Sequence, residues 1–510
     1  MIISLSVLVI TIIVSGTYAL YKAQLSKNIG VNTTTHGLAY YINYVKGTDI
    51  TAATLNPSTS YEGGASSDIE FWKKDDSYDI YGKIELTVNT IGTNLSNSPA
   101  LKYAVVNNGN VLKEGSLKGT TSGSKVTILK NLYLEQTKQI YTVYVWLDNS
   151  EELGNISNES LSISVDCTAS LQKEPTAADT IISLYTSAAK VTATNNSITY
   201  NTAPSVSLMN DRLGGTTTDL DGGNIRYYGA NPNNYIYFNC SDYSNQTSST
   251  CETWRIIGVI DGKLKLIKGS QIGTYSWDNK NISTGAEDDR GKNDWTTARL
   301  MKLLNPDDYY INDNNDKDSE GNYLGYSLYY NSASGMCFTD EGVNYSACDF
   351  TSTGIKNDET RNMIAETTYN LGGWNDTGVY PNEIYEYERG TTVYTGRPTT
   401  WTGKIALAYP SDYGYAADLN QCKQTLANYD NSTCTSNNWM KAIITDNGSN
   451  HGWLLTPDSS YSYVAWYSQG NVGEYFTGAA RGAVPVLSLS SKLGIESGDG
   501  SSSNPYKLSA

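Results

Sequence analysis

The chain has 510 residues, of which 17% are charged, and its 52 acidic against 36 basic residues give a formal net charge of −16. This balance excludes a nucleic-acid-binding protein and disfavours anionic membranes as partners, because nucleic acids and anionic membranes attract positively charged proteins. The length exceeds one ordinary domain and predicts roughly two to four.

The N-terminus predicts export. MIISLSVLVITIIVSGTYALY carries no charge before Lys22, and Thr17 and Ala19 are the small residues of a signal-peptidase site. We therefore expect a cleaved signal peptide over 1–19 and an extracellular or cell-surface protein. Without cleavage, the segment is just long enough to span a bilayer and anchor the chain. We expect contact with a membrane only in that case.

Residues 30–168 alternate apolar and polar side chains with a period of two. Ile84, Leu86 and Val88 alternate in KIELTVN, whereas QIYTVYVWLD (139–148) is apolar on both faces, as a central strand is. Turn signals separate these runs. The pattern predicts an antiparallel β-sandwich.

Three stretches of this region carry a family likeness. SGTYALYKAQLSKNIGVNT (15–33), YTVYVWLDNSEE (141–152) and SLSISVDCT (160–168) together resemble the camelysin and TasA-type biofilm matrix proteins of Gram-positive bacteria. The resemblance implies a jelly-roll-like extracellular domain capable of self-assembly into fibres. The protease activity described for camelysin is not carried over, since the chain has no His-Glu-x-x-His pattern.

Residues 169–205 are predicted to be a helical and polar linker. PTAADTIISLYTSAAK (175–190) places Ile181 and Tyr185 at helical spacing, with Thr176 as the expected N-cap. The following TATNNSITYNTAPS is polar and rich in turn residues.

Residues 206–510 predict a second, loop-rich α+β domain. A β-hairpin is expected around Asp261-Gly262 in WRIIGVIDGKLKLIKG, and helices over Trp295–Leu304 and Asp358–Leu371. Long loops between such elements are usually functional.

Six of the seven cysteines pair by position. The pairs are Cys240 with Cys251, Cys337 with Cys348, and Cys422 with Cys434. Each pair encloses a polar loop, so three local disulfides are predicted, with reduced surface cysteines as the alternative. Disulfides form in oxidising compartments, in agreement with export. Cys167 is left over and is predicted to be a buried or terminal-strand thiol.

Tyrosine is unusually abundant, with 41 residues beside 5 phenylalanines. Its ring gives a large rigid contact area with a polar tip, which binding surfaces favour. The densest stretch, WLLTPDSSYSYVAWYSQGNVGEYF (453–476), predicts a hairpin that turns at 468–470. The candidate ligand-binding residues are Asp458, Ser459, Ser460, Tyr461, Tyr463, Trp466, Tyr467, Gln469, Asn471, Glu474 and Tyr475. The alternative is that Trp453, Trp466 and Tyr475 fill the core.

The C-terminal third carries a second likeness. TTWTGKIALAYPSDYGYA (399–416), NNWMKA (437–442) and AVPVLSLSS (483–491) are similar to a family of secreted gut Firmicutes proteins, and the ending resembles C-type-lectin-like folds. The resemblance implies a disulfide-stapled C-type-lectin-like head. The family has an arginine where this chain has Val484, and Arg481 is the nearby residue able to replace it in ordering the last loop.

Two acidic patterns resemble calcium sites in part. NDNNDKDSEGN (312–322) has the opening spacing of a calcium loop but lacks the twelfth-position carboxylate, so a solvated acidic loop is predicted. Trp374-Asn375-Asp376 and Pro381-Asn382-Glu383 resemble lectin calcium tripeptides in reversed order, which indicates chance. We therefore expect no metal and no cofactor.

Catalytic signatures are poor. The chain has two histidines. Two of Glu383, Glu386 and Glu388 would serve as a glycosidase pair if they lay a few ångströms apart, but an exposed acidic loop is predicted instead. The preferred interpretation is a non-enzymatic extracellular protein whose sandwich anchors or polymerises and whose lectin-like head binds a glycan or protein ligand. The alternatives are a structural biofilm-matrix or pilus-like fibre subunit, and a carbohydrate- or peptide-acting hydrolase.

Overall fold

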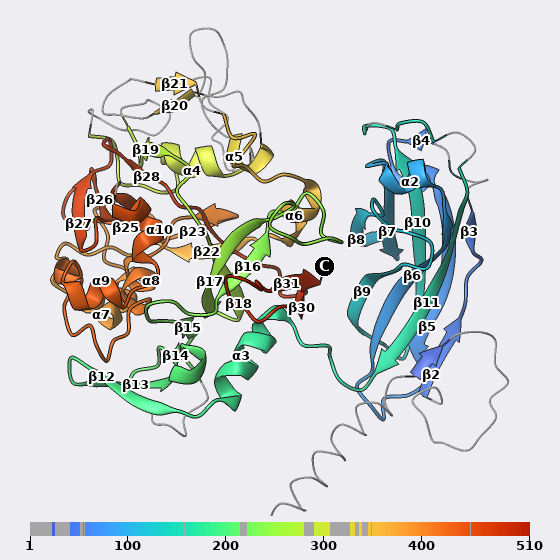
Figure 1. Ribbon diagram of the computed structural model, residues 1–510, viewed down its shortest axis with the longest axis horizontal. Coiled ribbons are helices and arrows are strands. Elements are labelled where there is room, and N and C mark those ends of the chain that lie inside the picture. Colours follow the sequence, from blue (N-terminus) through green and yellow to red (C-terminus); the bar gives the residue numbers. More distant parts are fainter. Residues whose placement is uncertain are drawn as a thin grey trace, which may run out of the picture. The chain divides into compact units, whose positions relative to one another are not determined.

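In the computed structural model the chain divides into two compact units, Met1–Glu174 and Pro175–Ser509 (Figure 1). The structure describes residues 23–25, 41–51, 55, 57–151, 153–156, 159–214, 222–279, 290–306, 327–331, 336–338, 345–347, 349–448 and 450–509. The predicted signal peptide or anchor (1–19) and the acidic loop 312–322 lie outside these residues. Among the helices of the described residues, none has the length and apolar character needed to cross a membrane.

The first unit consists of two sheets. The strands of one are, in order, β1 (Ala23–Leu25), β11 (Leu161–Ser170), β6 (Tyr81–Ile91) and β9 (Lys125–Tyr133), with β3 (Ile50–Thr51) also on β11. Those of the other are β2 (Ile42–Val45), β5 (Ala65–Lys73), β10 (Ile140–Asp148), β7 (Leu101–Asn107) and β8 (Asn110–Ser116), with β4 (Pro57–Ser58) parallel to β10. A short helix, α2 (Thr93–Asn97), follows β6.

The alternation of the sequence explains the sandwich core. Along β6, Ile84, Leu86 and Val88 are fully buried, while their neighbours are partly exposed. They pack in one cluster with β10 residues such as Val143 and Val145. The predicted central strand does lie between two others, β5 and β7. The prediction of an antiparallel β-rich fold is therefore confirmed. The thiol of Cys167 is free and buried in β11.

Of the residues predicted as a linker, 175–205 belong to the second unit and 169–174 to the first. Thr176 caps α3 (Ala177–Ser187) as expected: its Oγ1 accepts from the backbone N–H of Asp179, whose carboxylate accepts from the N–H of Thr176. The backbone N–H of Ala177 donates to Leu493 O, and Tyr185 is fully buried. Because the polar stretch after α3 forms two paired strands, the boundary between the units falls at 174/175 and not near 206.

The largest sheet of the second unit carries its centre. Its order is β12 (Val191–Asn195), β13 (Ile198–Ala203), β14 (Leu208–Asn210), β15 (Ile225–Tyr227), β17 (Glu252–Ile260), β18 (Lys263–Lys268), β29 (Val486–Ser488) and β24 (Ile405–Ala406), with β16 (Tyr235–Phe238) on β17. The expected hairpin joins β17 to β18, and its turn residues Asp261 and Gly262 have φ of 50° and 76°, as a type I′ turn requires.

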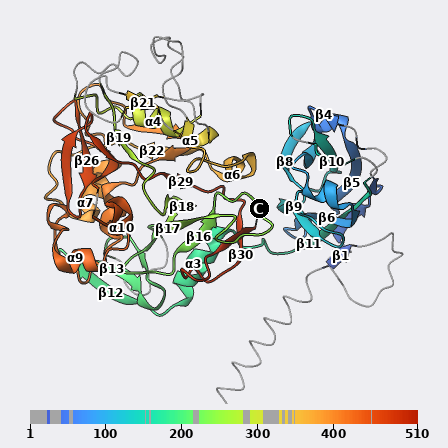
Figure 2. The ribbon, with the colours of Figure 1, turned by 45° about the horizontal axis from the view of Figure 1, so that its top comes forward.

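A second sheet has the order β19 (Thr274–Ser276), β28 (Ala480–Gly482), β25 (Gly452–Pro457), β26 (Val464–Ser468) and β27 (Val472–Phe476). The described residues also form three strand pairs: β20 (Met336–Phe338) with β21 (Tyr345–Ala347), β22 (Thr367–Asn370) with β23 (Thr400–Gly403), and β30 (Gly494–Ser497) with β31 (Lys507–Ser509). The second sheet lies at one side of the unit, with α7 and α10 nearby (Figures 1 and 2).

Short helices surround these sheets. They are α4 (Arg299–Leu304), α5 (Ser327–Tyr330), α6 (Asp358–Met363), α7 (Pro381–Glu388), α8 (Pro410–Tyr415), α9 (Ser432–Ser436) and α10 (Lys441–Ile444). Two are shorter than predicted. The side chain of Asp294 accepts from the N–H of Thr296 in a turn, so α4 begins only at Arg299. After α6, the β-branched Thr367 and Thr368 enter a strand pair.

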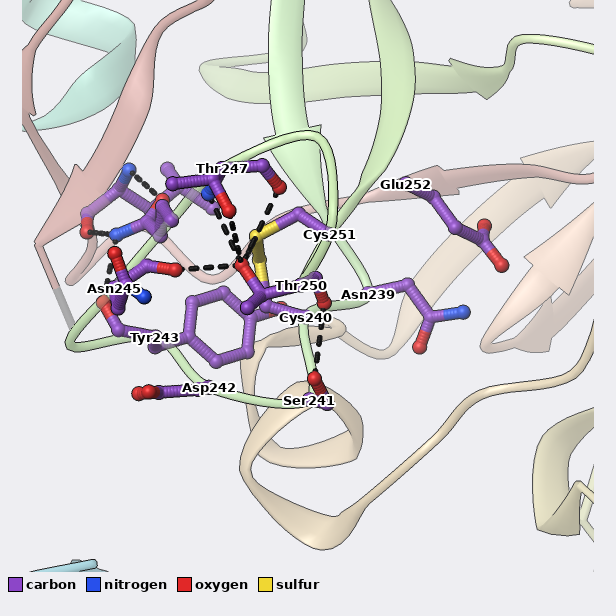
Figure 3. The surroundings of a disulfide bond; sticks show 12 residues. Asn239, Cys240, Ser241, Asp242, Tyr243, Asn245, Thr247, Thr250, Cys251 and Glu252 are labelled. Atoms are coloured by element: carbon purple, nitrogen blue, oxygen red, sulfur yellow. Dashed lines mark hydrogen bonds between the residues drawn. A yellow bond between two sulfur atoms is a disulfide. The ribbon is translucent and has the colours of Figure 1, made fainter. Parts of the chain in front are cut away.

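Two of the predicted disulfides are described. Cys240–Cys251 closes a polar loop in which Thr250 Oγ1 accepts from the N–H of Thr247 (Figure 3). Cys422–Cys434 is fully buried and attaches α9, which contains Cys434, to the preceding loop. For the third predicted pair, Cys337 lies in β20, whereas Cys348 is outside the described residues.

Candidate functional site

The tyrosine-rich stretch forms the hairpin that the sequence predicts. Strands β26 and β27 pair antiparallel, with Trp466 opposite Glu474. Two hydrogen bonds hold the turn between them: Tyr413 Oη donates to Gly470 O at 2.6 Å, and Asn471 Nδ2 donates to Ala427 O at 3.1 Å. The hairpin is thus fixed to the body of the second unit.

Six aromatic rings lie in a continuous chain along this hairpin, which we call the aromatic row. Its members, in spatial order, are His451, Tyr467, Tyr475, Phe476, Tyr463 and Tyr461. Successive ring centroids are 5.5, 6.2, 5.2, 5.6 and 6.0 Å apart. Tyr461, Tyr475 and Phe476 are 54%, 40% and 37% exposed. The guanidinium of Arg290 lies 3.8 Å from the ring of Tyr463. This is a contiguous exposed aromatic surface, the kind that marks binding sites.

The loop before β26, which carries two rings of the row, is held by one buried asparagine. Asn293 Nδ2 donates to the carbonyls of Asp458, Tyr461 and Val464 at 2.8, 2.8 and 3.0 Å. Arg397 in turn donates from Nε to Asn293 Oδ1 and from Nη2 to Ser462 O, both at 3.0 Å. The rings of this loop are therefore pre-organised, which lowers the entropic cost of binding.

A pair of carboxyl groups joins this loop to β27. Asp458 Oδ1 accepts from the backbone N–H groups of Ser460 and Tyr461 at 2.5 and 2.7 Å. Asp458 Oδ2 and Glu474 Oε1 are both buried without a hydrogen-bond partner among the described residues, and the two carboxyls lie close enough for the charge of one to act on the other. Burial and the neighbouring Asp458 charge raise the pKa of Glu474 to about 7. Burial likewise raises the pKa of Asp458. One proton shared between the two carboxyls satisfies both oxygens.

Two tryptophans support the hairpin from inside. Trp466 is fully buried, and its Nε1 donates to Trp374 O at 3.2 Å. The ring of Trp374 stacks on Tyr387 of α7 at 3.8 Å. Trp453 is also fully buried, with its Nε1 donating to Tyr275 O at 2.8 Å. These rings anchor β25 and β26 in the core.

The structure separates the predicted site residues into three groups. Ser460, Tyr461, Gln469 and Tyr475 are exposed, and Ser459, Tyr463, Tyr467, Asn471 and Glu474 are partly exposed. The remaining two, Asp458 and Trp466, are fully buried. The inclusion of these two in the contact surface is corrected: Trp466 points inward on β26, and the carboxyl of Asp458 caps its own loop.

The sequence missed several residues of this surface. His451 and Phe476 extend the aromatic row, and Arg481 lies against it, 4.1 Å from the ring of Tyr467. The residue that pins the loop, Asn293, is 165 positions from Asp458 along the chain. Only Phe476 could have been found locally, because it directly follows Tyr475 in the same aromatic-rich stretch. The guanidinium of Arg481, which was expected to order the last loop, lies against the rings of Tyr467 and Tyr475.

The acidic residues weighed for catalysis lie on α7 and not in a loop. Glu383 Oε2 accepts from the N–H of Tyr380 and so caps the helix. Glu388 is fully buried, accepting from both the N–H and the Oγ of Ser411, and burial raises its pKa to about 7. Glu386 is exposed. Within the described part of the chain, no three His, Cys, Asp or Glu side chains are grouped so as to hold a metal ion.

No family model matches the chain, and no curated protein matches it. The receptor binding domain of botulinum neurotoxin mosaic serotype C/D is similar at 11% identity over 52% of this chain and 75% of that chain, with a TM-score of 0.15. The botulinum neurotoxin serotype D binding domain is 10% identical over 50% of this chain and 75% of that chain, with a TM-score of 0.15. A mutant of HCR/D is 11% identical over 53% of this chain and 77% of that chain, with a TM-score of 0.16. Likenesses this weak carry no argument about function.

Proposed function

We propose that the chain is an exported binding protein that contacts a glycan or protein ligand through the aromatic row. The observation that carries this proposal is the continuity of exposed rings, of which Tyr461 and Tyr475 are 54% and 40% exposed. Scattered exposed aromatics are ordinary on protein surfaces, whereas a contiguous patch usually has a partner.

The rigidity of the row supports the same proposal. Its loop is pinned by Asn293 and its turn by Tyr413, so the rings need little ordering when a ligand arrives. Two disulfides, Cys240–Cys251 and Cys422–Cys434, support export, because such bonds persist in oxidising compartments. Assembly of the N-terminal sandwich into fibres stays a prediction from its resemblance.

The test is an array of glycans and extracellular proteins probed with the full chain. We expect at least one ligand whose binding is lost when Tyr461 and Tyr475 are both replaced by serine. Tyr330→Ser is the matched control, since Tyr330 is 42% exposed on α5, outside the row. Equal binding by the wild type and the double variant on every retained spot contradicts the proposal, as does a wild type that binds nothing.

A further inference from the structure

One end of the aromatic row carries a positively charged group among rings. Arg481 lies on β28, and the centre of its guanidinium is 4.1 Å from the ring of Tyr467 and 4.3 Å from that of Tyr475. The ring of Trp453 is 5.7 Å away. Guanidinium groups are favoured over aromatic faces, and the two tyrosines therefore fix where this planar group lies.

His451 contributes a second donor at the same place. Arg481 Nη1 lies 2.8 Å from His451 Nδ1. A guanidinium can only donate, so Nδ1 accepts and the imidazole carries its proton on Nε2. Burial and the Arg481 charge lower the pKa of His451, which keeps the ring neutral at physiological pH. The pair thus has one positive charge, and its His451 side is exposed.

The charge of Arg481 meets no carboxylate among the described residues. Arg226 of the same unit, by contrast, contacts Asp211 and Asp412 at 2.7 and 2.9 Å. Burial lowers the pKa of Arg481, opposed by the phenols of Tyr467 and Tyr475 and by no carboxylate, and its Nε is buried without a hydrogen bond. In a chain of net charge −16, a partly buried guanidinium without an anion is a group that a ligand can complete.

We propose that Arg481, with His451, Tyr467 and Tyr475, forms a subsite for the carboxylate of an acidic sugar. This inference rests on the proposed function and names the ligand class of the same surface. A carboxylate meets the planar guanidinium through paired N–H···O hydrogen bonds. The exposed part of the Tyr475 ring offers an aromatic surface for the pyranose, and the phenol hydroxyls offer hydrogen bonds to its substituents.

A sugar suits this surface better than an acidic peptide. Besides Arg290 and Glu474, the side chains next to the row along the chain include the hydroxyls and amides of Ser459, Ser460, Gln469 and Asn471. The exposed large hydrophobic residues of the hairpin are all aromatic, namely Tyr461, Tyr475 and Phe476. Peptide recognition usually needs an anchor side chain seated in an apolar pocket, whereas flat rings surrounded by polar groups match a pyranose.

The experiment compares paired oligosaccharides on the full chain. Each uronic-acid or sialic-acid oligosaccharide is offered in its carboxylate form and with the carboxyl reduced to an alcohol. We expect at least one carboxylate form to bind about tenfold more tightly than its reduced partner, as a charged hydrogen-bonded pair allows. The preference weakens between about 50 and about 300 mM NaCl, since salt screens the attraction.

Variants at one position separate charge from packing. Arg481→Gln removes the preference for the carboxylate form, and Arg481→Lys retains part of it, because lysine keeps the charge and loses the planar fork. Arg361→Gln is the matched control. Arg361 lies on α6, near the rings of Tyr329 and Tyr330 of α5 and outside the aromatic row, and it contacts Asp358 at 2.6 Å. Near-ultraviolet circular dichroism confirms that each variant is folded.

The outcomes distinguish this inference from the proposed function. Equal binding of both forms, or a preference unchanged in Arg481→Gln, overturns the acidic-sugar subsite. If neutral glycans or proteins still bind and the Tyr461→Ser/Tyr475→Ser variant loses them, the proposed function stands without it. Binding to an aspartate-rich peptide and to no oligosaccharide of any pair also overturns the subsite.

Discussion

Replacing Glu474 by glutamine removes the titratable half of the carboxyl pair. The amide has the same shape as the protonated carboxyl and can donate permanently to Asp458 Oδ2. In the wild type, that bond exists only while Glu474 holds its proton, because two adjacent carboxylates repel each other. The variant therefore resembles the low-pH form of the wild type at every pH.

The sign of the pH dependence follows from the raised pKa of Glu474, which moves from 4.5 to about 7 on folding. Between these values the folded chain keeps a proton that the unfolded chain has lost, so the free energy of unfolding falls as pH rises and levels off above about 7. Full conversion of this pKa change gives about 3 kcal/mol. Because Glu474 is partly exposed, solvent screening reduces the expected effect to about 1–2 kcal/mol.

The assay is urea unfolding followed by tryptophan fluorescence, with wild type and variant compared at pH 4.5 and pH 8. We expect Glu474→Gln to be more stable than the wild type by about 1–2 kcal/mol at pH 8 and by less than about 0.5 kcal/mol at pH 4.5. Glu386→Gln, at an exposed position of α7, controls for the loss of one negative charge. A variant less stable than the wild type at pH 8, or a difference independent of pH, refutes the reasoning.

Other substitutions test the supports of the same surface. Replacing Cys422 and Cys434 by serine should lower the free energy of unfolding by about 3 kcal/mol, because the disulfide closes a short loop in the unfolded chain. Urea titration measures this loss, and a loss below about 1 kcal/mol contradicts the prediction. Trp466→Ala should cost about 3–5 kcal/mol because the ring is fully buried. Tyr461→Ala should change the free energy of unfolding by no more than about 0.5 kcal/mol. If thermal unfolding shows similar losses for Trp466→Ala and Tyr461→Ala, the division into core and surface rings is wrong.

Local patterns in the sequence predicted the elements that depend on neighbouring residues. Alternation in KIELTVN predicted β6 and its buried face, Thr176 predicted the start of α3, and Asp261-Gly262 predicted a hairpin. The failures involve long-range pairing. The region after α3 looks like a linker because its strands are polar, yet β13 is paired on both sides within the largest sheet.

The site divides in the same way. The hairpin and its exposed tyrosines follow from the composition of one stretch, but the burial of Trp466 and Asp458 does not, since alternation alone does not say which face is covered. Arg481 and Asn293 reach the surface from other strands and loops, and no local signal marks them. The abundance of tyrosine also misleads in part: Tyr413 and Tyr429 are core rings whose hydroxyls donate to backbone carbonyls.

Hydroxyl-radical footprinting of the full chain, with and without a ligand retained on the array, measures most directly whether the aromatic row faces outward and meets a partner. Oxidation of Tyr461, Tyr475 and Phe476 should be fast in the free protein, slow at the buried Tyr413, and reduced by ligand along the row alone. Row residues as protected as Tyr413 before ligand is added, or protection by ligand that appears elsewhere on the chain, would contradict the account.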